Sequence, residues 1–260
     1  PVEYAVTLNS TNQIQNLNFK SSKASPFEIM VYNIDFESLL FNKIKFTAGF
    51  KMVDNDFINE NSLSRDNIVD LNFDNYSSLS EEIIAGYSQF NFDLSKNISV
   101  QSGIRYEDTI TRIFDLNLNQ VIVERSYGNF FPSVFIGYKI NDFNNLNLSY
   151  SKRISRPAFT DMAPMLIFLD LNTAVFGNLS LRPAFSRNYQ IDYRYKSIGL
   201  SAQYSNENDV FAKFSPTINS ETNFITYSPN DPSFVYNEQN AVILNFFGIY
   251  CSIVSDFLLQ

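Results

Sequence analysis

The sequence predicts an all-β protein, folded as an antiparallel, up-and-down transmembrane β-barrel. Three observations lead to this prediction. Several segments alternate apolar and polar residues with a period of two, short and long links alternate between these segments, and aromatic residues make up 16% of the 260 residues. Successive side chains of a strand point to opposite faces, so each alternating segment has one apolar and one polar face.

The alternating segments have the length of a membrane strand. Within residues 43–52, Ile44, Phe46 and Phe50 oppose Lys45. The same alternation recurs in residues 28–37, 98–107, 146–153 and 188–195. Each segment has about ten residues, which a tilted strand needs to cross a bilayer, whereas strands of soluble proteins usually have about 5–6.

The links between the segments alternate in length. Short links are predicted at residues 39–42, 95–97, 141–145 and 196–197, and long, polar links at 54–80, 110–127 and 155–184. Outer-membrane barrels have short periplasmic turns and long extracellular loops. The link lengths therefore favour a membrane barrel over a soluble β-sandwich, which the period-two pattern alone would also allow.

Composition excludes several classes of function. The net charge of −8 gives no basic footprint for nucleic acid. The absence of histidine excludes Ser–His and Cys–His catalysis and removes the commonest metal ligand. Glu81 and Glu82 are adjacent and would point to opposite faces, so they would not share a catalytic site. We expect no enzyme activity and no cofactor, and a solvated loop rather than a calcium site at Asp54, Asp56 and Glu60.

The segment from Tyr150 to Tyr195 contains several motifs in a fixed order. They are Tyr150-Ser-Lys-Arg153-Ile-Ser-Arg156-Pro157, Met162-Ala-Pro164, Gly177-Asn178, Leu181-Arg182-Pro183 and a tyrosine-rich strand. Upstream lie Glu81 to Phe90, Gly103-Ile-Arg105-Tyr-Glu107-Asp-Thr109 and Phe131-Pro132-Ser133. In this order the motifs resemble the outer-membrane protein β-barrel family of Bacteroidota, a branch of the TonB-dependent receptors.

The resemblance is strongest at residues 150–195 and has departures. Leu179 stands where the family has the proline of Gly-Asn-Pro, and Arg182 replaces a lysine. The resemblance implies a location in the bacterial outer membrane and a barrel of about 22 strands. Residues 1–260 would form one incomplete region of that barrel, either a middle portion of a larger receptor or a truncated gene product.

The resemblance also implies an energised importer of scarce solutes such as iron chelates, cobalamin or glycans. Its partners would be outer-membrane lipid, a plug domain, the TonB energy complex and a surface lipoprotein, and no nucleic acid. A porin or structural outer-membrane protein without a plug is the first alternative. A soluble β-sandwich that binds glycans is the second, and an outer-membrane hydrolase is the most distant.

Arginines at the ends of the long link 155–184 are candidate contact residues. Arg153 and Arg156 stand where a strand enters this link, and Arg182 stands near its end. They could bind an anion or face a plug. The favoured interpretation is structural, in which they pair with link carboxylates such as Asp161 and Asp170 and order the link.

Residues expected to face the lumen complete the candidate set. Arg105 and Glu107 lie on the polar face of their strand, as do Asp35 and Asp192 on theirs. The candidate loop and lumen contacts are Arg153, Arg156, Arg182, Asp161, Asn178, Arg105 and Glu107.

Overall fold

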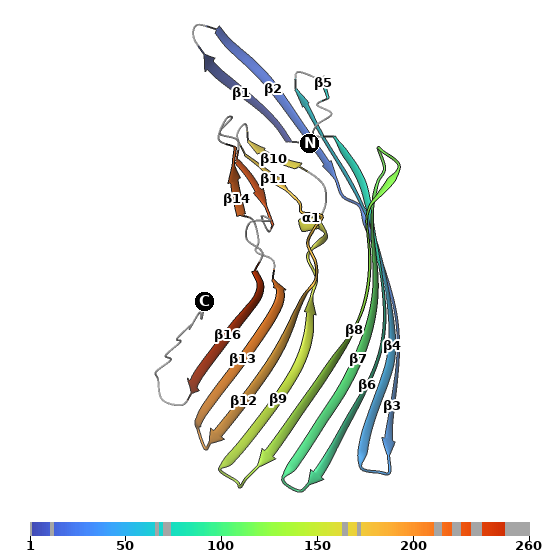
Figure 1. Cartoon of the computed structure of the whole chain (residues 1–260), viewed down its shortest axis with the longest axis vertical. Helices are drawn as coiled ribbons and strands as arrows, with labels where there is room; N and C mark the ends of the chain where they lie inside the picture. The colour runs from blue at the N-terminus through green and yellow to red at the C-terminus, as the bar shows by residue number, and fades with distance from the viewer. Residues whose placement is uncertain are drawn as a thin grey trace.

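The computed structural model describes residues 2–10, 13–65, 68–69, 74–162, 166–170, 173–210, 215–219, 225–229 and 236–247. These residues form one large antiparallel sheet, curved like a section of a barrel wall, and a smaller four-stranded sheet near one end of it (Figure 1). The large sheet contains β1 (Val2–Ser10), β2 (Gln13–Ala24), β3 (Phe27–Leu40), β4 (Ile44–Arg65), β5 (Ile68–Val69), β6 (Asn75–Ser95), β7 (Ile98–Asp115), β8 (Gln120–Lys139), β9 (Asn144–Ser155), β12 (Ala184–Tyr195), β13 (Ile198–Val210) and β16 (Tyr236–Phe247).

The smaller sheet and one short helix belong to the links at the end of the wall opposite the short turns. The sheet contains β10 (Leu166–Asp170), β11 (Thr173–Phe176), β14 (Ser215–Ile218) and β15 (Ile225–Ser228), and the helix is α1 (Phe159–Met162). The sequence did not predict α1. No helix in the described residues is long and apolar enough to cross a membrane.

The wall is built from sequential hairpins, as an up-and-down barrel requires. The strand order is β1-β2-β4-β6-β7-β8-β9-β12-β13-β16, and β3 and β5 each pair with β4. Within the described residues β3 does not pair with β16, so the sheet is open (Figure 1). An incomplete portion of a barrel is therefore confirmed. One curved sheet, in place of two stacked sheets, shows that the β-sandwich alternative is wrong.

The strands β2 and β3 are two parts of one long strand. Ala24 pairs with Glu60 of β4, and Phe27 pairs with Phe57, so the register is the same on both sides of the break. Pro26 interrupts the ladder because it has no backbone N–H. Its carbonyl still accepts a hydrogen bond of 3.0 Å from the backbone N–H of Ile58.

The two faces of the wall differ in polarity along the strands whose side chains are described, such as β4, β7, β9 and β12. The outer face exposes large apolar side chains that lie next to one another through the register, as Leu148 does with Ile191 and Tyr189 with Tyr204. A soluble monomer rarely exposes an apolar surface of this extent, whereas lipid would cover it. The concave inner face presents polar residues such as Lys45, Gln89, Arg105, Ser151 and Gln190 on the same strands.

The short turns are confirmed, and two of the predicted long links are wrong. β4 and β6 stay paired up to Asn61 and Asn75, and β7 and β8 up to Asp115 and Gln120. Most of residues 54–80 and 110–127 is therefore strand. Beyond the apolar belt both faces can meet water, so polar side chains there do not interrupt the backbone ladder. The link from β9 to β12 contains α1, β10 and β11, and the link from β13 to β16 contains β14 and β15.

Candidate functional site

A cavity of about 690 Å³ lies against the inner face of β4, β6, β7, β8 and β9. It brings together four of the seven predicted contact residues, Arg105, Glu107, Arg153 and Arg156. The remaining three, Asp161, Asn178 and Arg182, lie in the link between β9 and β12, outside the cavity lining.

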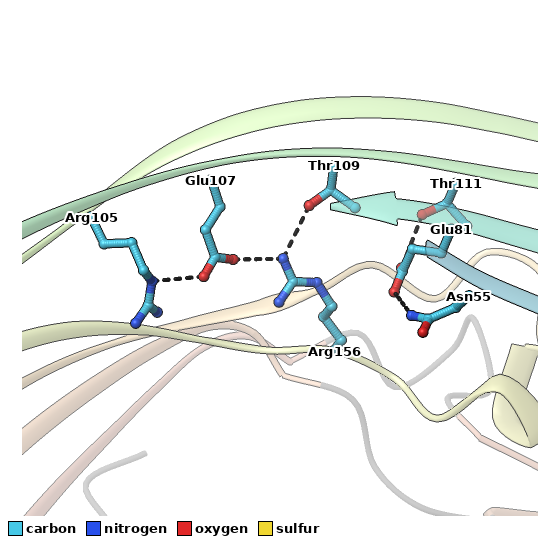
Figure 2. Close-up of polar contacts among 7 residues, drawn as sticks. All are labelled: Asn55, Glu81, Arg105, Glu107, Thr109, Thr111 and Arg156. Carbon is cyan, nitrogen blue, oxygen red and sulfur yellow. Dashed lines mark hydrogen bonds and ion pairs between the residues drawn. The ribbon is translucent and has the colours of Figure 1, made fainter. Parts of the chain in front are cut away.

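Glu107 is the centre of an ion-pair network in this cavity. Its Oε1 accepts a bond of 2.7 Å from Arg105 Nε, and its Oε2 accepts one of 2.7 Å from Arg156 Nη2 (Figure 2). The same Arg156 nitrogen donates to Thr109 Oγ1 at 3.0 Å. Arg105, Glu107 and Thr109 alternate along β7, so their side chains share its inner face. The network joins β7 to the residue that follows β9.

The polar column on β7 continues towards the end of the wall where the links lie. Thr111 Oγ1 donates to Glu81 Oε2 at 3.1 Å, and Asn55 Nδ2 approaches Glu81 Oε1 at 3.5 Å (Figure 2). These residues come from β7, β6 and β4. Thr109 and Thr111 are buried, so the column is packed rather than fully solvated.

Burial sets the electrostatics of the network. The side chain of Glu107 is 11% exposed and that of Arg156 is 23% exposed. Burial alone would lower the pKa of Arg156, but the hydrogen bond to Glu107 and the nearby Tyr127 outweigh it and raise that pKa above its ordinary value. Burial also raises the pKa of Tyr127. The guanidinium of Arg156 therefore stays charged, and its ion pair with Glu107 is only partly screened by water.

The link between β9 and β12 folds inward onto the inner face. Met162 and Leu181 from the link pack with Leu79 of β6 and Ile113 of β7 in a buried apolar cluster. This contact places α1 inside the curve of the wall (Figure 1). The link therefore narrows the space enclosed by the wall instead of projecting away from it.

Polar contacts fix the same link at two further points. The guanidinium of Arg125 donates to the backbone carbonyls of Leu179 and Leu181. Within the link, Asp161 Oδ2 accepts a hydrogen bond of 3.3 Å from the backbone N–H of Ala158, and the backbone N–H of Asn178 donates to the Asp161 carbonyl at 2.7 Å. Asp161 and Asn178 thus shape the link and make no contact with the cavity.

The structure corrects the predicted ion-pair partner of Arg156, which was a carboxylate of the link. Arg156 does order the start of the link, but it pairs with Glu107 of β7 and not with Asp161. Arg153 is exposed and makes no ion pair with a described residue. Arg182 is exposed, and its charge adds to burial in lowering the pKa of Arg125. Pro164 and the side chain of Asp170 lie outside the described residues.

Sequence reasoning missed Arg125, Tyr127 and Thr109. Arg125 and Tyr127 lie within residues 110–127, for which the sequence predicts a long link. The usable signal was the alternation of β7, because Thr109 and Thr111 continue the odd-numbered face that contains Arg105 and Glu107. Asp54, Asp56 and Glu60 lie on β4, and the part of the chain with described positions has no group of three or more acidic or cysteine residues placed to share a metal ion.

The sequence matches the model of the outer membrane protein beta-barrel family over residues 3–247. No curated protein matches it.

Solved structures with a similar fold are bacterial receptors and transporters. The unliganded ferric citrate transporter FecA has a TM-score of 0.55 and 10% identity, over 93% of this chain and 34% of that one. The ferric enterobactin receptor PfeA of Pseudomonas aeruginosa has a TM-score of 0.51 and 13% identity, over 95% and 37%. The ferric yersiniabactin uptake receptor FyuA of Yersinia pestis has a TM-score of 0.50 and 14% identity, over 96% and 36%.

Identities of this size indicate likeness of fold alone. The chain spans about a third of the length of the solved structures it matches.

Proposed function

Because this chain belongs to the outer membrane protein beta-barrel family of the bacterial outer membrane, we propose that it forms part of the barrel wall of a TonB-dependent receptor. The intact receptor would take up a scarce solute of the iron-chelate, cobalamin or glycan class. Its partners would be a plug domain, the TonB energy complex and a surface lipoprotein. We propose no catalytic activity for it.

The observation that best supports this function is the shape of the sheet. The wall has an apolar outer face and a polar inner face, and it remains open at β3 and β16. Lipid cannot cover unpaired strand edges, so further strands must complete the wall in the membrane. This chain spans 34% and 37% of two receptors of similar fold, which leaves room in proteins of that length for those strands and for a plug.

A passive pore is the second candidate. The inward-folded link between β9 and β12 favours it, because a link fixed by Arg156 and Arg125 narrows the lumen without a plug. A structural outer-membrane protein would need neither a narrowed lumen nor a polar cavity, and we rank it below the pore.

Uptake by cells that produce the intact gene product would test the proposal. Accumulation of radiolabelled iron chelate, cobalamin and glycan would be compared in wild-type cells, a deletion of this gene and a deletion of the TonB protein. A receptor requires that both deletions abolish uptake of the same solute. Uptake that survives loss of TonB, together with steady conductance in planar bilayers, would establish the pore instead.

A further inference from the structure

The cavity on the inner face has a charge opposite to that of the chain. Its lining contains five cationic residues and one acidic residue, an excess of four positive charges. The chain as a whole has a net charge of −8. The cations are Lys51, Arg105, Lys152, Arg153 and Arg156, and the carboxylate is Glu107.

Two of the five cations already have a partner. Arg105 and Arg156 share Glu107. Lys51, Lys152 and Arg153 make no ion pair within the described part of the chain. β9 separates from β8 after Ser151, and beyond that point the adjacent residues Lys152 and Arg153 both line the cavity. The charges of these three residues therefore remain available to a ligand that reaches the cavity.

Lys152 is held in place by uncharged groups. Its Nζ lies 3.3 Å from Asn129 Oδ1 and 5.6 Å from the centre of the Phe131 ring, and it lies 5.3 Å from the centre of the Phe185 ring. Aromatic faces attract an ammonium group without neutralising it. The contacts orient this lysine and leave its positive charge uncompensated.

The size and the walls of the cavity suit a small molecule. Its volume of about 690 Å³ lies within the range of about 300–1,000 Å³ that is usual for small-molecule sites. The lining includes hydrogen-bonding side chains of Ser133, Ser151 and Gln89 on paired strands.

We propose that this cavity binds a small solute with two or more oxyanion groups, such as carboxylates or phosphates. One oxyanion group would neutralise only one of the three unpaired cations, whereas a polyanion can contact several at once. Arginine matches a carboxylate or phosphate with two parallel donors, and lysine adds a point charge. This inference rests on the proposed function, because it names the class of solute that the receptor would take.

Equilibrium dialysis of the purified full-length gene product would test the site. The probes are citrate and tripolyphosphate, with maltotriose as a neutral control of similar size. The test variant is K152Q/R153Q. The matched control is K96Q/K196Q, which removes two lysines from the short turns at the other end of the wall. Mobility on unheated gels would establish that each variant is folded, and K51Q provides a milder second variant.

We expect at least one polyanion to bind more tightly than maltotriose, and its affinity to fall as salt is raised. K152Q/R153Q should weaken that binding at least tenfold, K51Q should weaken it by a smaller factor, and K96Q/K196Q should leave it within twofold. Equal affinity for maltotriose, no binding of either polyanion, or equal loss in the control variant would overturn the inference.

The outcome is separable from that of the proposed function. TonB-dependent uptake of a neutral solute, without polyanion binding, would reject the site and retain the receptor. Polyanion binding by a protein whose conductance does not need TonB would retain the site and reject the receptor.

Discussion

Glu107 and Arg156 lie 49 residues apart in the chain, and their side chains form an ion pair of 2.7 Å on the inner face of the wall. Glu107 belongs to β7, and Arg156 directly follows β9 at the start of the inward-folded link. The pair thus fixes the point at which this link leaves the wall.

Replacing Arg156 with methionine should loosen the link. The substitution keeps much of the side-chain length but leaves Glu107 largely buried without one of its two cations. We expect a loss of about 1–3 kcal/mol in the free energy of unfolding, below the usual value for a buried pair because Arg156 is partly exposed. Urea titration in lipid vesicles and protease cleavage within residues 157–183 would measure it. Arg182→Met is the control, and equal cleavage of the two variants would contradict the role of the pair.

Leu181→Ala should detach the link through its apolar contact. Leu181 is 2% exposed and packs with Leu79, Ile113 and Met162. Truncating a buried leucine usually costs about 2–5 kcal/mol. We expect protease cleavage of the link to accelerate while the membrane strands stay folded. Leu118→Ala, at a position 67% exposed, should leave the cleavage rate unchanged. Similar rates in the two variants would mean that the cluster does not hold the link.

The assignment of the outer face is tested by two adjacent residues of β12. Ile191 points to the outer face and Gln190 to the inner face. An arginine on the lipid side near the bilayer midplane costs about 2–4 kcal/mol in a membrane barrel. Ile191→Arg should therefore reduce the folded fraction in vesicles, and Gln190→Arg should not, since Asp192 lies beside it. A lower folded fraction for Gln190→Arg than for Ile191→Arg would show that the outer and inner faces are wrongly assigned.

Gly49 should not tolerate a side chain. Tyr87 crosses β4 at this glycine and donates a hydrogen bond to Asp35 on β3. A Cβ atom at Gly49 would lie 2.5 Å from Tyr87 Cζ and from Asp35 Oδ1. Gly49→Val should cost about 1–3 kcal/mol through this overlap. Gly86→Val is the control, because a Cβ there meets no atom within 4 Å. Equal unfolding midpoints for the two variants would reject the contact.

The period-two pattern was sufficient to predict the two faces and the short turns. It placed Arg105 and Glu107 on one face of one strand, and their ion pair follows from that spacing. The pattern does not predict which residue outside β7 pairs with Glu107. Contact between Glu107 and Arg156 depends on the register of β8 with β7 and of β8 with β9. A single sequence does not specify the register between strands.

The length of the strands was underestimated for a different physical reason. The polarity of Asp54-Asn55-Asp56 predicts the start of a loop, yet β4 continues to Arg65. A strand needs an apolar face only where lipid or a core covers it. Where both faces meet water, the backbone ladder alone maintains the pairing, and composition no longer marks the end of the strand. Whether the candidate contact residues touch a solute stays a prediction.

The extended strands β4 and β6 also determine which part of the protein lies beyond the membrane. β4 has 22 residues and β6 has 21. At about 3.3 Å per residue, each is about 70 Å long, more than twice the roughly 30 Å thickness of the hydrocarbon layer. A rim of paired backbone thus stands above the membrane already ordered, so capture of a molecule there sacrifices little conformational entropy. Substitution of a single side chain on such a rim can alter its binding specificity, because the paired backbone keeps its conformation.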